Sequence, residues 1–148
     1  MNNVLPFPTR SSDLARVSAF VSEPPPLVLV AESDCNDRSE LKELLDLYGV
    51  RVLEAENGEE AVDLTVRECP NLVLMNAALP ILDGYEAARL IRSIKSFDQT
   101  PIIFLSSETE RVFRKKALDA GADGFHFAPL DFDRLDQILE NFLFRTNA

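Results

Sequence analysis

The sequence predicts an α/β protein built on a doubly wound parallel sheet of five strands, (βα)5. Five short, mostly apolar segments alternate with five segments whose apolar residues recur every three or four positions. Strands that alternate with helices in this way form a parallel sheet with helices on both faces, joined by right-handed crossovers. The expected architecture is a three-layer sandwich.

The first strand and helix have the clearest signals. Residues 27–31 (Leu-Val-Leu-Val-Ala) are apolar without interruption, which is typical of a strand buried on both faces. Gly49 is expected to end the following helix as a left-handed C′ residue. The inner face of that helix has i, i+3, i+4, i+7 spacing and comprises Leu41, Leu44, Leu45 and Tyr48.

The second and third units each begin a helix with a capping signal. After a more polar strand at residues 51–54, Asn57 with Glu60 forms a capping box. After the strand at residues 72–75, Asp83 is expected to cap a helix with Glu86 three residues later. The predicted inner face of that helix is Ala87, Leu90, Ile91 and Ile94.

The fourth and fifth units complete the pattern. Pro101 opens a strand at residues 102–105, and Ser107 with Glu110 predicts another capping box. Gly121 is expected to stop that helix, and residues 125–128 form the last strand. The predicted buried residues of these two helices are Phe113, Ala117 and Ala120, then Leu135, Ile138, Leu139 and Phe142.

The N-terminus differs from the rest. Residues 1–26 hold five of the nine prolines, and the run Pro24–Pro26 is expected to be stiff and extended. Between the prolines, residues 13–21 have only a weak helical pattern. We therefore expect a flexible extension over residues 1–25 and one domain over residues 26–146.

Composition limits the possible partners. The chain has 25 acidic and 15 basic residues, a formal net charge of −10, which disfavours direct nucleic-acid binding because phosphate backbones are repelled. No segment approaches the ~20 apolar residues of a membrane span, and the start lacks the pattern of a signal peptide. The prediction is a cytoplasmic protein with no membrane contact.

Several kinds of binding and catalytic site lack the residues that they require. The five glycines form neither Gly-x-Gly-x-x-Gly nor a P-loop, so nucleotide binding is not expected. Cys35 and Cys69 have no metal-binding spacing and are expected to be buried or inert. His126 is the only histidine, which excludes Ser-His-Asp or Cys-His catalysis built on another histidine; it is expected to be a packed or surface residue.

The polar residues that follow the strands are the candidate site, since ligands of such sheets bind at the carboxyl ends of the strands. Glu32 alone would be a weak Mg²⁺ ligand, because hard cations want several carboxylate oxygens; Asp34 is as well explained as a helix cap. Ser106 is expected to point into the crevice, either as a hydrogen-bond donor or as a small residue at a tight turn. The positions to inspect are residues 32–34, Asn57, Asn76, 106–107 and Ala128.

These strand ends resemble the response-regulator receiver domains of two-component systems, which have the flavodoxin-like form of this fold. The resemblance extends over about residues 26–144, in order and with the family's spacing. It is carried by residues 27–34, 55–61, 70–86, 100–107 and 120–125.

The resemblance implies a degenerate phosphorylation site. The family's acidic pair maps onto Glu32 and Ser33, so the second carboxylate, normally the main Mg²⁺ ligand, is a hydroxyl. The phosphoacceptor aspartate maps onto Asn76, and an amide cannot form the acyl phosphate. The family's lysine maps onto Ala128.

Two switch positions of the family are kept. The hydroxyl that senses the phosphoryl group maps onto Ser106, and the aromatic switch residue maps onto Phe125. With one formal charge left at Glu32, we expect Asn76 to bridge Glu32 and Ser106 by hydrogen bonds. The resemblance further predicts a cis peptide between Ala128 and Pro129.

The resemblance therefore implies a bacterial, non-enzymatic pseudo-receiver without a cofactor, with weak Mg²⁺ binding at Glu32 at most. The expected partner is a histidine kinase, a phosphotransfer protein or an output protein, and no DNA-binding output is expected. The alternatives are a phosphorylatable response regulator with a non-standard acceptor and a module that binds a small molecule in the crevice. The expected contact face, on the fourth helix, fifth strand and fifth helix, includes Val112, Lys115, Lys116, Phe125 and parts of residues 131–144.

Overall fold

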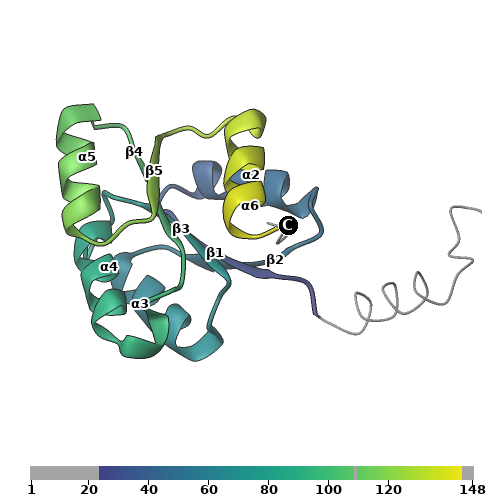
Figure 1. Cartoon of the computed structure of the whole chain (residues 1–148). Coiled ribbons are helices and arrows are strands. Elements are labelled where there is room, and N and C mark those ends of the chain that lie inside the picture. The colour runs from purple at the N-terminus through teal and green to yellow at the C-terminus, as the bar shows by residue number, and fades with distance from the viewer. Residues whose placement is uncertain (1–23, 109, 145–148) are drawn as a thin grey trace, which may run out of the picture.

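The computed structural model describes residues 24–108 and 110–144, and it has the predicted three layers (Figure 1). A five-stranded parallel sheet has the order β2-β1-β3-β4-β5. The order reverses between β1 and β3, which places the topological switch point there. The strands are β1 (Leu27–Ala31), β2 (Arg51–Ala55), β3 (Leu72–Asn76), β4 (Ile102–Ser106) and β5 (Gly124–Phe127).

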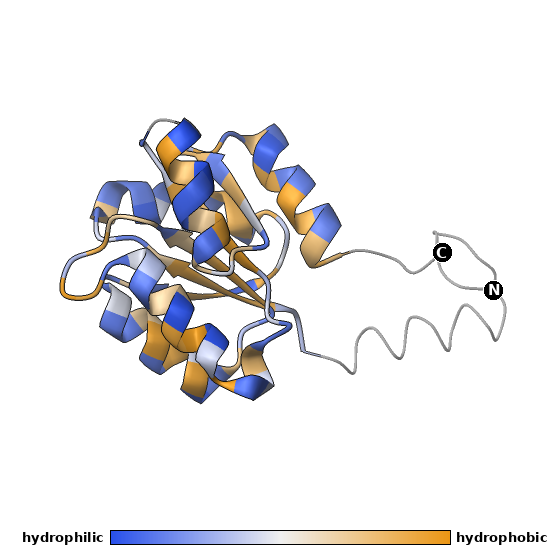
Figure 2. Cartoon of the chain, turned by 60° about the vertical axis from the view of Figure 1, so that its left-hand side comes forward, coloured by the Kyte–Doolittle hydropathy of each residue, from blue (hydrophilic) through white to orange (hydrophobic). Residues whose placement is uncertain are grey.

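Helices cover both faces of the sheet. Two of them, α2 and α6, lie on one face, and α3, α4 and α5 lie on the other (Figure 1). Figure 2 shows the helices with mixed colouring and the strands between them mostly hydrophobic. The helices are α2 (Cys35–Asp46), α3 (Gly58–Glu68), α4 (Gly84–Ser93), α5 (Glu110–Asp119) and α6 (Phe132–Phe142), with a 3-10 turn, η1 (Lys95–Phe97).

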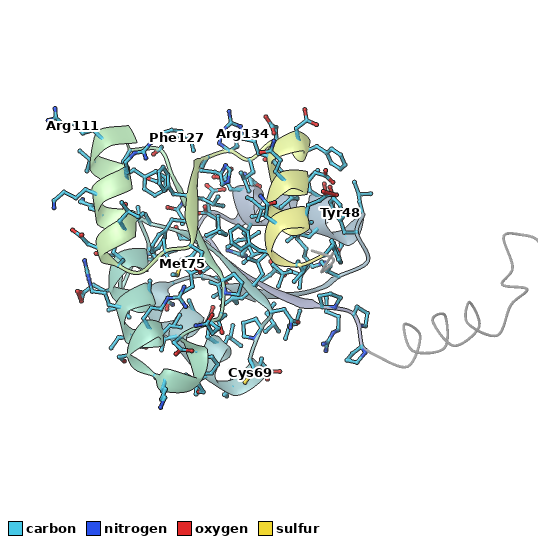
Figure 3. All side chains as sticks on the ribbon, viewed as in Figure 1. Tyr48, Cys69, Met75, Arg111, Phe127 and Arg134 are labelled. Carbon is cyan, nitrogen blue, oxygen red and sulfur yellow. The ribbon has the colours of Figure 1, made fainter. Side chains whose placement is uncertain are left out.

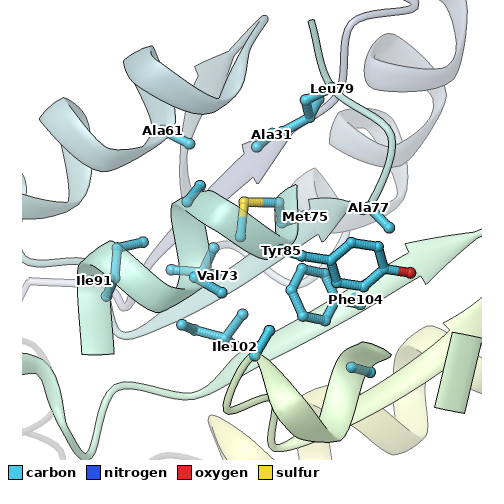
Figure 4. Close-up of a cluster of buried hydrophobic side chains, with 14 of the residues drawn as sticks. Ala31, Ala61, Val73, Met75, Ala77, Leu79, Tyr85, Ile91, Ile102 and Phe104 are labelled. Atoms are coloured by element: carbon cyan, nitrogen blue, oxygen red, sulfur yellow. The ribbon is translucent and has the colours of Figure 1, made fainter. Parts of the chain in front are cut away.

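Two hydrophobic cores follow from the alternation of side chains along the strands. On β1, Leu29 and Ala31 face the α3–α4–α5 layer, while Val28 and Val30 face α2 and α6. The first core is shown in Figure 4, where Tyr85 lies against Phe104 with ring centroids 5.0 Å apart. Because both faces are buried, the central strands are apolar except at the ends of β3 and β4, where Asn76 and Ser106 lie.

Side-chain caps begin four of the helices as acceptors for backbone N–H groups. Asn57 accepts from Glu60 and Asp83 accepts from Glu86, which confirms both predicted caps. The Glu60 carboxylate accepts from the backbone N–H of Glu56 at 2.7 Å, one residue before the position that a capping box uses. The other two caps are Asp34 for α2 and Asp131 for α6.

Two boundary predictions were wrong by small shifts. Helix α2 ends at Asp46, and Gly49, with φ 71°, lies in the following turn. The chain leaves the helix there because the ring of Tyr48 stacks on Phe132 and its hydroxyl donates to Asp136 at 2.7 Å. Strand β5 ends one residue earlier than expected, so that Ala128 follows it.

The prediction that Ser107 caps the next helix stays a prediction. Helix α5 begins at Glu110, and Ser107 is exposed in the connection before it. The capping position itself lies outside the described residues. Leu90 is 48% exposed instead of buried, because the buried stripe of α4 comes from Tyr85, Ala87, Ala88 and Ile91.

Both cysteines were expected to be buried or inert; they are exposed and free, so the first of these alternatives was wrong. Residues 24–26 have no helix, as expected of three prolines. The predicted weak helix at residues 13–21 lies outside the described part of the chain. Within the described part, no helix is long and apolar enough to cross a membrane.

Candidate functional site

The candidate site lies where β1, β3 and β4 end, beside the topological switch point. Glu32 follows β1, Asn76 is the last residue of β3, and Ser106 is the last residue of β4. The parallel register carries all three ends to one edge of the sheet, since Ala31 pairs with Met75 and Asn76 with Leu105. The structure therefore brings the predicted residues to one place.

Glu32 and Asn76 form the centre of the site. The Asn76 Nδ2 donates to Glu32 Oε1 at 2.7 Å, and the backbone N–H of Asp34 donates to Glu32 Oε2 at 3.0 Å. Glu32 is only 7% exposed. A buried carboxylate is costly unless hydrogen-bonded, and here each of its oxygens has a donor.

The other end of the Asn76 amide is also used. Its Oδ1 accepts from the backbone N–H of Ala78 at 2.8 Å, which fixes the rotamer of the side chain. Gly84 keeps the loop close to the end of β3, because a Cβ there would lie 2.4 Å from the backbone oxygen of Asn76. Both functional ends of the amide are thus engaged within the protein.

The residues next to Glu32 point elsewhere. Asp34 caps α2, its Oδ1 accepting from Asp37 at 2.9 Å, so the capping interpretation is confirmed. Ser33 is exposed. Among the described residues, no group of three His, Cys, Asp or Glu side chains could hold a metal ion. A donor set of one buried, already hydrogen-bonded carboxylate does not fit Mg²⁺, which prefers several oxygen ligands.

The prediction that Asn76 bridges to Ser106 was wrong. Ser106 is 2% exposed, and its Oγ accepts from the backbone N–H of Glu108 at 2.9 Å. The hydroxyl folds back onto its own loop because this short local bond satisfies it without reaching across the crevice. Its expected position facing the crevice is corrected accordingly.

The loop after β4 is held by a polar cluster that the sequence did not reveal: Tyr85, Glu108 and Lys116, called here the loop clasp. The Tyr85 hydroxyl donates to Glu108 Oε1 at 2.7 Å, and Lys116 Nζ lies 3.3 Å from Glu108 Oε2. The ammonium also lies 5.6 Å from the Tyr85 ring centroid. The clasp joins α4, the loop and α5.

The clasp changes the acidity of its members. The Tyr85 hydrogen bond, with help from Lys116 and Ser106, lowers the pKa of Glu108 despite its partial burial. Burial and the Glu108 carboxylate raise the pKa of Tyr85 well above its usual value. Both shifts favour an ionised Glu108 that accepts from a neutral phenol.

The two aromatic positions of β5 face α5. Phe125 is half-buried and packs edge-on against Phe113 at 5.1 Å, with the Arg114 guanidinium 5.2 Å from its ring centroid. Phe127 lies at the end of β5 nearest α5 and is 37% exposed (Figure 3). His126 points to the other face, where desolvation and Arg134 lower its pKa. The Ala128–Pro129 peptide is cis, as predicted.

Comparison with known proteins agrees with this geometry. The family model described as the response regulator receiver domain matches residues 28–140. The chain belongs to the response regulator receiver family. Response regulator MprA of Mycolicibacterium vanbaalenii is 34% identical over 122 residues, which are 82% of this chain and 52% of that protein. The chain thus spans about half the length of the curated relatives it matches.

Solved receiver structures have the same fold. The receiver domain of sensor histidine kinase PA1611 from Pseudomonas aeruginosa PAO1, solved with magnesium coordinated in its active site cleft, is 29% identical. It superimposes with a TM-score of 0.75 over 80% of this chain and 97% of that one. A putative response regulator from Chloroflexus aurantiacus J-10-fl is 25% identical, with a TM-score of 0.77 over 82% and 99% of the two chains.

The sequence contains a partial signal for the loop clasp, which was not predicted. Tyr85 lies at the second position of α4, and Glu108 follows the hydroxyl pair after β4. Helix α4 begins, and strand β4 ends, at the same edge of the sheet, so a contact was conceivable. Its pairing depends on side-chain directions that spacing alone does not give.

Proposed function

We propose that this receiver domain is a pseudo-receiver, which signals by protein–protein contact and is not switched by phosphorylation at Asn76. The observation that carries the proposal is the 2.7 Å hydrogen bond from Asn76 Nδ2 to Glu32 Oε1. An amide lacks the carboxylate oxygen that attacks a phosphoryl donor. Here its nitrogen is also occupied, as a donor to the one buried carboxylate of the site.

Charge supports the same interpretation. Removing one partner of a buried polar cluster usually leaves another group without a hydrogen bond. Here Asn76 donates to Glu32, and the two side chains accept hydrogen bonds from the adjacent backbone N–H groups. Ala128, which has no cationic group, lies at the same crevice. The site is stable as a neutral amide beside a single carboxylate, with no need of a metal ion.

The state of the β4–α5 loop supports a constant, unswitched conformation. A phosphate sensor must be free to move toward the phosphoryl group, whereas the Ser106 hydroxyl is tied to Glu108. The loop clasp in turn fixes Glu108 to α4 and α5. Phe125 is already packed inward against Phe113.

The proposed contact surface is the α5–β5–α6 face. Strand β5 is at the edge of the sheet, and among the described residues its one partner strand is β4. Exposed edges readily accept another chain. Val112 is 44% exposed beside it, and Phe127 adds further apolar area. The partner classes are a histidine kinase, a phosphotransfer protein or an output protein.

Chemical phosphorylation tests the proposal. The full chain is incubated with acetyl phosphate and Mg²⁺, and its intact mass is measured. We expect no added phosphoryl group, while the triple variant Ser33→Asp, Asn76→Asp, Ala128→Lys gains one under the same conditions. Phosphorylation of the unaltered chain would favour the alternative, a response regulator with a non-standard acceptor.

Two matched valines test the contact surface. Val112 on α5 and Val66 on α3 are 44% and 45% exposed, so Val112→Lys and Val66→Lys make equal chemical changes on two helices of the same layer, of which only α5 belongs to the proposed face. Binding is measured by interferometry against purified histidine kinases and phosphotransfer proteins. We expect Val112→Lys alone to weaken the complex; equal affinities for both variants would contradict the proposed face.

A further inference from the structure

A pocket of about 770 Å³ lies between α2 and the loops that follow β4 and β5. Glu32, Asn76 and Ala128 line its inner part, so it opens from the candidate site. Its volume is within the usual range for small-molecule sites. It is separate from the α5–β5–α6 face.

Most of the pocket wall is apolar. Leu41 and Leu44 come from α2, and Leu105, Pro129 and Leu130 come from the two loops and the end of β4. Leu47 at the outer end is 74% exposed, which is unusual for a leucine side chain. Such a wall favours an aliphatic group, because contact would remove its surface and that of the leucines from water.

The charged groups of the pocket are all negative. Four carboxylates line it, from Glu32 inside and Asp37, Glu40 and Glu43 along α2, and no lining residue in the described part of the chain is basic. The two basic residues of α2 are engaged elsewhere. Arg38 bonds to Glu54 and to the backbone oxygen of Glu32, and Lys42 pairs with Asp46.

The carboxylates of the pocket do not fit a divalent metal ion, which needs several oxygen ligands at one point. No three carboxylates of the described residues come close enough to share one ion. A cation that fits the pocket must therefore pair with one carboxylate at a time and must also make apolar contact with the leucine side chains. An ammonium group on an alkyl chain meets both requirements, because it has three donors and an apolar stem.

We propose that this pocket binds a small aliphatic primary amine. The alkyl chain lies along Leu41, Leu44 and Leu130, and the ammonium is directed toward Glu32, with the rim carboxylates of α2 attracting the cation. The inference goes beyond the proposed function and does not depend on it, since an amine could bind whether or not the domain is ever phosphorylated.

Amide NMR of the full chain with n-hexylamine tests the proposal, with n-hexanol as a neutral probe of the same length. We expect saturable shifts at Leu41, Leu44, Leu105 and Leu130 with the amine, and binding of the alcohol at least about tenfold weaker, equivalent to one charge contact of about 1.4 kcal/mol. Equal affinities would mean an apolar cavity without charge recognition and would overturn the proposal. So would the absence of saturable shifts with the amine.

Three variants and one control locate the ammonium. Glu32→Gln keeps the shape of the side chain and is expected to weaken hexylamine about tenfold, and the exposed pair Glu40→Gln, Glu43→Gln provides a second test that carries little risk to folding. Glu59→Gln on α3 is the matched control and is expected to leave the affinity unchanged. Ala128→Lys should place an ammonium in the pocket and compete with the amine. Unchanged affinity in Glu32→Gln and in the Glu40, Glu43 pair would refute the proposed orientation.

Discussion

Replacing Asn76 by aspartate is expected to destabilise the fold at neutral pH. The change puts a second carboxylate where Nδ2 now donates to Glu32 at 2.7 Å, inside a site where Glu32 is 7% exposed. Two unit charges about 4 Å apart repel by about 4 kcal/mol at an effective dielectric constant of about 20, and a hydrogen bond of about 1 kcal/mol is lost. Proton uptake by the pair limits the net cost to about 2–4 kcal/mol.

The pH dependence gives the mechanism. In Asn76→Asp the two neighbouring carboxylates have a raised pKa in the folded state. The folded variant is therefore most stable, relative to the unaltered chain, at low pH, and it loses that stability as the pH rises through the raised pKa. The free energy of unfolding of the variant should therefore approach that of the unaltered chain as the pH falls from about 8 to about 5. Urea unfolding followed by circular dichroism measures this.

Asn76→Leu is the matched control, because it loses the same hydrogen bond without adding charge. It should cost about 1–2 kcal/mol with little dependence on pH over that range. If Asn76→Asp is as stable as the unaltered chain at neutral pH, the argument for a settled amide–carboxylate site is refuted.

Three further changes test other parts of the structure. Tyr85→Phe removes the largest cause of the lowered pKa of Glu108, so a carboxyl NMR titration should find that pKa nearer its usual value; an unchanged pKa would exclude the clasp. Because the pKa of Glu108 is lowered in the folded state, its ionised carboxylate stabilises the fold above the unfolded-state pKa, and this stability is lost as the pH falls through the folded-state pKa. Tyr85→Phe should reduce that loss of stability in acid. Arg92→Ala removes donors to the backbone oxygens of residues 97, 100 and 121 and to Asp123, and should cost about 2–3 kcal/mol in urea unfolding; a loss below about 0.5 kcal/mol would contradict this. His126 has a lowered folded pKa, so the chain should lose stability as pH falls below about 6.5, and His126→Gln should lack this part of the pH profile.

The fold was predictable because its signals are local and repeated. The uninterrupted apolar run of β1 and the caps at Asn57 and Asp83 fix strand type and helix starts within a few residues. The ends of the helices were harder to predict. Helix α2 stops at Asp46 because Tyr48 has partners on α6, 88 residues away in the case of Asp136, and no local pattern contains that information.

The candidate site was predictable in position and only partly in contacts. Glu32 and Asn76 meet because parallel strands end at one edge of the sheet, which the strand order alone requires. Ser106 does not join them, since its own loop offers a backbone donor two residues away. Side-chain choices of this kind depend on rotamers and on local donors, which spacing in the sequence does not determine.

Amide NMR of the full chain, titrated with Mg²⁺ and then with beryllium fluoride as a mimic of the phosphoryl group, tests whether the domain can still be switched. For a pseudo-receiver, the amide signals of Glu32, Asn76 and Ser106 should not shift, and Phe125 should remain in its present environment. Saturable shifts that begin at Asn76 and extend to Phe125 would show a working phosphorylation switch and would contradict the proposed function.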